Sequence, residues 1–231
     1  MREYLLDLPS FIISLTIYIF ISKLTIQKYF QTRDYILIIF LILELGLIYD
    51  IIIILLGFLM PNDLLLFFNK LRFILHGILV PSLILFCGYA LNASGKFYYG
   101  HLFFNIILTI TGLILGIITK LTIVEGSLIK RCIFSKDNSL IIILIFSFIN
   151  IICVIYMIIV GIILFINKRE KFFLLSGIFM FLFSAIGPTI GKTYLNYLFS
   201  MYGEILMVIF LYLFFRKKME FKIKSKNLKI N

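Results

Sequence analysis

Charged residues are scarce in this chain of 231 residues, and tryptophan is absent altogether. Only 14% of the residues are Asp, Glu, Lys or Arg, whereas soluble globular domains carry about 25%. Hydrophobic residues make up 62% of the chain, and the mean hydropathy is +1.13. This composition excludes a soluble globular domain and indicates a membrane protein.

Cysteine and the common catalytic motifs are also poorly represented. The three cysteines, Cys87, Cys132 and Cys153, are an odd number without a C-x-x-C spacing, so the sequence indicates neither a disulfide framework nor a zinc site. H-E-x-x-H, G-x-S-x-G and P-loop motifs are missing, and with them the groups for zinc proteolysis, elbow-type serine hydrolysis and nucleotide hydrolysis. We therefore expect no metal and no resident cofactor.

Seven long apolar stretches make up most of the sequence. They lie at 8–22, 35–59, 69–91, 102–119, 139–166, 173–190 and 194–215. A helical span needs about 20 predominantly apolar residues, and continuous rather than alternating apolar runs favour helices over a β-barrel. The predicted fold is all-α: one bundle of seven transmembrane helices at 1–215, followed by a basic tail at 216–231, in the cell membrane.

The distribution of lysine and arginine predicts the orientation of this bundle. The first, third and fifth loops and the C-terminal tail together hold 14 of the 22 Lys and Arg residues, and the opposite side holds eight. The positive-inside rule then places the N-terminus outside and the C-terminus in the cytoplasm. Seven of the 22 lie in the last 16 residues, which favours contact between the tail and lipid rather than nucleic acid.

Five ionisable residues lie inside the predicted spans. Each costs about 2.5–3.5 kcal/mol at the centre of a span, so it is retained where it is paired or has a function. They are Glu44 and Asp50 in LILELGLIYDIIII, Arg72 and His76 in KLRFILHGILVP, and Glu204 in FSMYGEILMV.

The depths of these residues predict that most of them meet. At 1.5 Å per residue, Asp50 lies roughly 13 Å, His76 roughly 10 Å and Glu204 roughly 15 Å below the outer ends of their spans. Arg72 lies one turn above His76 on the same helix face. Glu44 is six residues from Asp50 and projects about 120° away from it, so one of these two acids is expected to have another partner.

Two interpretations of the cluster remain open. In the first, the charges clamp helices together, with Asp50 or Glu204 neutralising Arg72. In the second, they line a polar cavity that opens outward. Three acids face one arginine and one histidine, so we expect at least one carboxyl group to be protonated at neutral pH and able to donate a proton, as a general acid or in a relay.

Further positions predict ligand contacts and packing. Asn150 inside the fifth span, with Lys192 and Tyr194 over the outer mouth, joins Arg72 as a candidate ligand-binding residue, and Glu204, Glu44, Asp50 and His76 are the candidate catalytic residues. Gly112 and Gly116 form a G-x-x-x-G pair that permits close helix approach, including contact with a second copy of the chain. The expected partners are membrane lipids and a hydrophobic small molecule.

An acid in the second span, Glu44 in LELGLIYD, and another in the seventh, Glu204 in YGEILM, resemble in part the fungal integral-membrane meroterpenoid cyclases. In that family, acids of early and late spans protonate an isoprenoid, but a tryptophan precedes the first acid, where this chain has Leu43. The chain is therefore not assigned to the family. Three functions stay open: an enzyme that acts on a lipid or isoprenoid by acid catalysis, a small proton-coupled transporter or permease, and a membrane sensor or interaction subunit.

Overall fold

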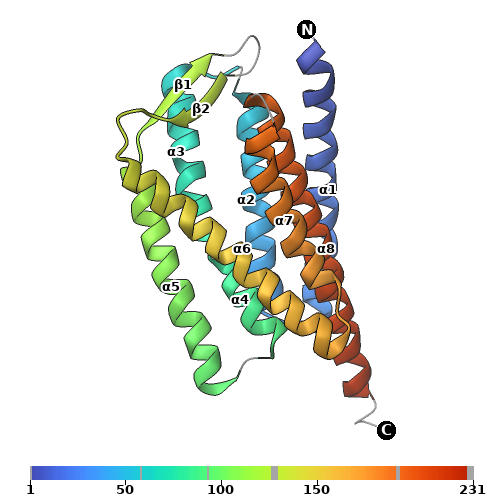
Figure 1. Ribbon diagram of the computed structural model, residues 1–231. Coiled ribbons are helices and arrows are strands. Elements are labelled where there is room, and N and C mark those ends of the chain that lie inside the picture. Colours follow the sequence, from blue (N-terminus) through green and yellow to red (C-terminus); the bar gives the residue numbers. More distant parts are fainter. Residues whose placement is uncertain (1, 58, 93, 126–129, 191–192, 228–231) are drawn as a thin grey trace.

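The computed structural model describes residues 2–57, 59–92, 94–125, 130–190 and 193–227. These residues form an elongated helical bundle with one β-hairpin (Figure 1). The helices are α1 (Arg2–Thr32), α2 (Ile36–Leu56), α3 (Asn62–Leu79), α4 (Ser82–Ala90), α5 (Gly95–Ile118), α6 (Leu140–Lys168), α7 (Phe172–Ile190) and α8 (Thr193–Asn227), and the strands are β1 (Leu121–Glu125) and β2 (Lys130–Phe134).

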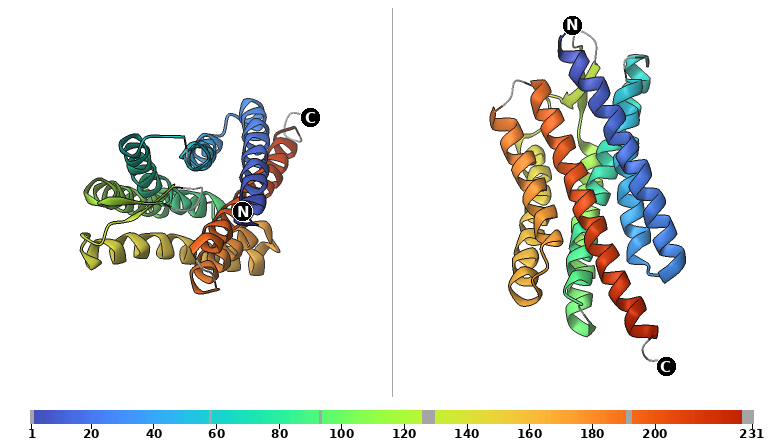
Figure 2. Two further views of the ribbon diagram at one scale, coloured as in Figure 1. Left: turned by 90° about the horizontal axis from the view of Figure 1, so that it is seen from above. Right: turned by 90° about the vertical axis from the view of Figure 1, so that its right-hand side faces the viewer.

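The chain runs back and forth along the long axis of the bundle. The start of α1 and the β-hairpin lie at one end, here called the hairpin end (Figure 1). The last residues of α1, α4, α6 and α8 lie at the other end, here called the basic end. Seen along the axis, α3 and α5 lie on one side and α1 and α8 on the other, while α6 extends across from the side of α5 to α7 (Figure 2).

Five helical segments of the described chain are long and apolar enough to cross a membrane. They are Pro9–Thr32, Ile36–Leu56, Asn62–Ala90, Gly95–Ile118 and Leu140–Lys168. Each overlaps one of the first five predicted spans, so the structure is that of a helical membrane protein. The apolar part of α7 that was searched, Phe172–Phe183, is shorter. The count of seven spans and the orientation therefore stay predictions.

The outer surface of the bundle is apolar. Large hydrophobic side chains are exposed along α5 and α6, among them Phe103, Ile110, Ile117, Phe148 and Ile162. Glu44 and Asp50 are instead buried between helices. An apolar exterior around buried polar groups suits a bundle whose solvent is lipid rather than water.

The third span is made of two helices, because α3 ends at Leu79 and α4 begins at Ser82. Pro81 stands between them and has no backbone N–H with which to continue the hydrogen-bond ladder. The Ser82 hydroxyl donates to the Leu79 carbonyl at 2.6 Å and satisfies one of the groups at this break. The candidate span Asn62–Ala90 is thereby interrupted between Leu79 and Ser82.

Three glycines let α3 and α5 touch through their backbones. A Cβ atom added to Gly77 would lie 2.4 Å from the carbonyl oxygen of Gly112, and one added to Gly116 would lie 2.9 Å from the Cα atom of Ile74. The predicted G-x-x-x-G pair is thus used within one chain. α3 packs on this face of α5, and self-association of the chain through Gly112 and Gly116 stays untested.

The β-hairpin is a difference from the predicted helices and loops. β1 and β2 pair antiparallel, from Leu121 opposite Phe134 to Glu125 opposite Lys130. Asn138 closes the base of the hairpin, since its side-chain oxygen accepts from the Lys120 N–H and its amide donates to the Lys120 carbonyl, both at 2.7 Å. Thr122, Ile123 and Val124 of β1 are β-branched, which favours a strand, whereas the hydropathy pattern predicts only a long loop here.

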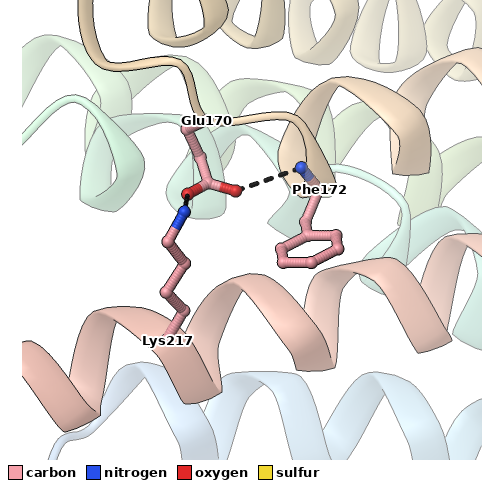
Figure 3. Close-up of polar contacts among 3 residues, drawn as sticks. All are labelled: Glu170, Phe172 and Lys217. Carbon is pink, nitrogen blue, oxygen red and sulfur yellow. Dashed lines mark hydrogen bonds and ion pairs between the residues drawn. The ribbon is translucent and has the colours of Figure 1, made fainter.

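α8 continues without a break past residue 215, where the basic tail was predicted to begin. Its 35 residues span about 52 Å, more than the roughly 30 Å of a hydrocarbon core. Phe215 and Met219 are fully buried, and Lys217 binds Glu170, which follows α6 (Figure 3). The first part of the tail is therefore packed against the bundle.

Candidate intramembrane site

An ion pair joins α2 to α3 inside the bundle. The Nε atom of Arg72 lies 3.3 Å from Oδ2 of Asp50, and the side chains are 24% and 11% exposed. The sequence predicts Asp50 at the level of His76 and Arg72 one turn higher, and the long side chain of Arg72 reaches Asp50. Asp50 is thus an acidic partner of Arg72 in the described part of the chain.

Four polar side chains from four helices line one cavity of about 210 Å³. Asp50 comes from α2, His76 from α3, Asn150 from α6 and Glu204 from α8. We call this space the acidic cavity. Apolar side chains form the rest of its wall, including Leu43, Leu47, Leu79, Leu83, Met180 and Met207. Three of the ionisable residues predicted from the sequence are therefore neighbours around one space, together with Asn150.

An aromatic layer lies on the hairpin side of this cavity. The His76 ring stacks on Phe146 at 6.3 Å between centroids. Phe73 packs against Phe134 of the hairpin at 5.0 Å, and Phe134 lies 6.2 Å from Phe146. Because Phe134 belongs to β2, the hairpin contributes directly to the packing above His76. This layer depends on the strands of the hairpin, which the hydropathy pattern does not predict.

Glu44 lies apart from the acidic cavity, at the interface of α1 and α2. Its side chain is fully buried. The Thr25 hydroxyl donates to Oε1 at 3.0 Å, while Oε2 has no hydrogen-bond partner among the described residues. The expectation that Glu44 and Asp50 have different partners agrees with this geometry. The structure does not bring Glu44 to the other candidate catalytic residues.

Two candidate ligand-binding residues are not placed. Lys192 lies outside the described residues, and so does the side chain of Tyr194. Their predicted position over an outer mouth therefore stays a prediction.

A histidine outside the predicted cluster is also buried. His101 of α5 is 5% exposed, with Nδ1 2.8 Å from the Phe97 carbonyl oxygen and Nε2 2.8 Å from the hydroxyl of Tyr156 in α6. This pair fastens α5 to α6. His101 directly precedes the apolar stretch 102–119 and Tyr156 lies inside 139–166. This position next to apolar sequence was the signal from which their burial could have been predicted. In the described part of the chain, no group of three or more His, Cys, Asp or Glu side chains could hold a metal ion.

The fold and the buried polar residues together are compatible with one class, a helical membrane protein with ionisable groups inside the bundle. Comparisons with protein families, with curated proteins and with solved structures find no significant match. The functional argument therefore rests on the chain itself.

Proposed function

We propose that the chain is a seven-span protein of the cell membrane with its C-terminus in the cytoplasm. The two termini of the described chain lie at opposite ends of the bundle, as an odd number of crossings requires (Figure 1). By sequence, 14 Lys and Arg residues belong to the basic end, against three acids, Asp34, Glu170 and Glu220. This asymmetry supports a cytoplasmic basic end.

Within this topology, we propose that the protein is a small proton-coupled transporter or permease whose site is the acidic cavity. The observation that carries the proposal is the convergence of Asp50, His76, Asn150 and Glu204 from four helices on one space. Ionisable groups that face a cavity inside a membrane mark proton relays and solute pathways. Asp50 is held by Arg72, and His76 and Glu204 supply two further groups that can each take up and release a proton.

The size of the acidic cavity supports a small solute. Its volume of about 210 Å³ is below the roughly 300–1,000 Å³ that is usual for sites of drug-sized ligands. A water molecule occupies about 30 Å³ of liquid, so the space suits several waters or one small polar molecule. A whole lipid or isoprenoid chain exceeds it.

Proton entry into proteoliposomes with a trapped pH dye tests this function. A membrane potential drives the flux, and amino acids, sugars and inorganic ions are added one at a time. We expect one solute class to increase proton entry by wild type, and Glu204→Gln or His76→Ala to lower that increase at least tenfold. Glu44→Gln is the matched control, because it alters a buried acid outside the cavity. An equal loss in Glu44→Gln, or no increase with any solute, contradicts the proposal.

An enzyme that acts on a lipid or isoprenoid is the second candidate. The apolar wall beside Glu204, formed in part by Leu43, Met180 and Met207, favours it, because an acid next to an apolar surface could protonate a double bond at the edge of the cavity. Native mass spectrometry with lipid extraction distinguishes this function. The enzyme function predicts that wild type retains a specific lipid and that Glu204→Gln and His76→Ala lose it. If all three proteins carry the same bulk lipids and the variants are merely less stable, the cluster is a helix clamp, as expected of a sensor or interaction subunit.

A further inference from the structure

A second cavity, of about 970 Å³, lies at the basic end of the bundle. We call it the basic cavity. It shares no lining residue with the acidic cavity, so an argument about it does not depend on the transport proposal. Its volume is within the range of ligand sites. Three lysines and three tyrosines contribute to its wall: Lys168, Lys217, Lys218, Tyr35, Tyr89 and Tyr98.

The two acids that line the basic cavity are already bound by cations. Glu170 accepts from Lys217 Nζ at 2.6 Å through Oε2 and from the Phe172 N–H at 3.1 Å through Oε1 (Figure 3). Glu220 accepts from Arg216 Nε at 2.9 Å. These contacts offset the charge of both carboxylates, so they oppose an incoming anion less than free carboxylates would.

The lysines present ammonium groups from two helices. Lys168 at the end of α6 is exposed, and its side chain makes no hydrogen bond or ion pair with any described residue. Lys218 of α8 donates to the Tyr89 carbonyl and lies 4.0 Å from the centroid of the Tyr89 ring. An ammonium group has three donors, so contacts of this kind still permit a bond to a ligand oxygen.

The tyrosines add neutral hydroxyl groups. The Tyr35 hydroxyl donates to that of Tyr98 at 3.5 Å, and the Tyr89 hydroxyl donates to Asp34 at 3.0 Å. The hydrogen bond to Tyr98, together with burial, raises the pKa of Tyr35 to about 12. Tyr35 therefore remains a neutral phenol at physiological pH and adds no negative charge to the site.

An apolar surface adjoins these polar groups. Leu164 and Phe214 are buried in the wall, and Phe221 at its edge is 76% exposed. Aromatic side chains next to lysines are typical of the level of lipid headgroups, and α8 is long enough to reach beyond the hydrocarbon core at this end. The ligand that fits has an anionic head and an apolar body.

We infer that the basic cavity binds the phosphate of an anionic phospholipid from the surrounding leaflet. The phosphate accepts hydrogen bonds from Lys168 and Lys218, and the acyl chains lie along the apolar surface outside. Lysine is a common phosphate-binding residue that acts as a point charge. Clusters of Lys and Arg beside a span also favour anionic lipid over neutral lipid.

Native mass spectrometry of the full chain tests this inference. The protein is released from vesicles of phosphatidylglycerol and phosphatidylcholine in equal amounts, and the retained lipids are counted. We expect wild type to retain phosphatidylglycerol selectively. Lys168→Gln should weaken this retention about fivefold, the change that corresponds to one surface lysine, and Lys168→Arg should restore it. Lys168 is exposed, so these variants are expected to fold.

Lys171→Gln is the matched control, because it removes the same charge at the same end from a residue that does not line the cavity. Equal weakening by Lys171→Gln, or no preference of wild type for phosphatidylglycerol, overturns the inference. A second arm adds inorganic phosphate to protein in phosphatidylcholine vesicles alone. If phosphate binds there, is lost in Lys168→Gln and displaces no lipid, the ligand is a soluble phosphate and the lipid assignment is wrong.

Discussion

Asp50 of α2 and Arg72 of α3 form an ion pair inside the helical bundle, with 3.3 Å between Oδ2 and Nε. The pair fixes the relative depth of the two helices. It also balances the charge of one carboxylate in the wall of the acidic cavity. Two acids therefore line the cavity, Asp50 of α2, which binds Arg72, and Glu204 of α8.

Removing one partner of this pair should destabilise the fold. Arg72→Gln leaves Asp50 buried without its guanidinium partner, which costs roughly 3 kcal/mol at the lower end of the range for buried pairs, since Arg72 is 24% exposed. Unfolding in detergent measures this loss. The double variant Asp50→Asn, Arg72→Gln should be closer to wild type than Arg72→Gln alone. The single variant Asp50→Asn completes the comparison. If the double variant loses as much stability as Asp50→Asn and Arg72→Gln together, the pair does not couple the helices.

Close packing of α3 on α5 predicts a contrast between two glycines of α5. Gly112→Ala should destabilise the protein by about 1–3 kcal/mol, because the added methyl group would meet the backbone of Gly77 at 2.3 Å. Gly100→Ala is the control, as nothing lies within 4 Å of a Cβ atom there. It should change stability little or raise it by up to about 1 kcal/mol. Equal thermal unfolding temperatures for both variants would contradict this packing.

The hydrogen bond between Thr25 and Glu44 predicts a role in stability rather than in transport. Thr25→Val removes the donor to Oε1 and leaves a buried polar atom without a partner, which costs about 1–3 kcal/mol. Thr16→Val on the same helix is the control, because the Thr16 hydroxyl is exposed and bonds to the Ile12 carbonyl of its own helix. Unfolding of both variants in detergent gives the comparison. Similar stability for the two variants would refute a structural role for this contact.

Cysteine labelling tests the proposed orientation. In a Cys132→Ser background, Lys136→Cys near the hairpin should react with a membrane-impermeant maleimide in intact cells. Lys171→Cys at the basic end should react only after the cells are permeabilised. Both lysines are exposed, and the remaining Cys87 and Cys153 are buried. The reverse pattern would place the hairpin in the cytoplasm.

The native thiol of the hairpin should react slowly and with a shifted pH dependence. Burial raises the pKa of Cys132 above its ordinary value. At pH 8, a smaller fraction of Cys132 than of an exposed cysteine is therefore in the reactive thiolate form. Its alkylation rate should keep rising with pH after that of an exposed cysteine has levelled off. Lys136→Cys in the Cys132→Ser background supplies the exposed reference. Identical pH profiles for Cys132 and the exposed reference would show that Cys132 is not shielded from solvent.

Much of the bundle could be predicted because the relevant signals are local. An apolar run of span length predicts a helix wherever it lies, since a backbone in lipid must satisfy its own hydrogen bonds. The five spans from Pro9 to Lys168 follow this rule. Helix rise predicts that Asp50 lies near the level of Arg72 and His76, but it leaves Asp50 and Glu204 as alternative partners of Arg72. The structure pairs Arg72 with Asp50.

Other features of the candidate sites were not predictable in this way. The burial of Glu44 against Thr25 depends on the rotation of α2 about its axis, which α1 sets by packing. The strands of the hairpin depend on pairing between residues 121–125 and 130–134. The basic cavity brings Tyr35, Tyr98 and Lys218 together from three separate parts of the chain.

Composition and hydropathy thus determined by themselves that this is a helical membrane protein with rare ionisable groups inside its apolar stretches, because transfer from water to lipid is a property of each segment. The tertiary structure decided which of those groups share a space. Asp50, His76, Asn150 and Glu204 line one cavity and Glu44 lies apart from it, since helix rotation and tilt are set by side-chain packing between segments distant in sequence.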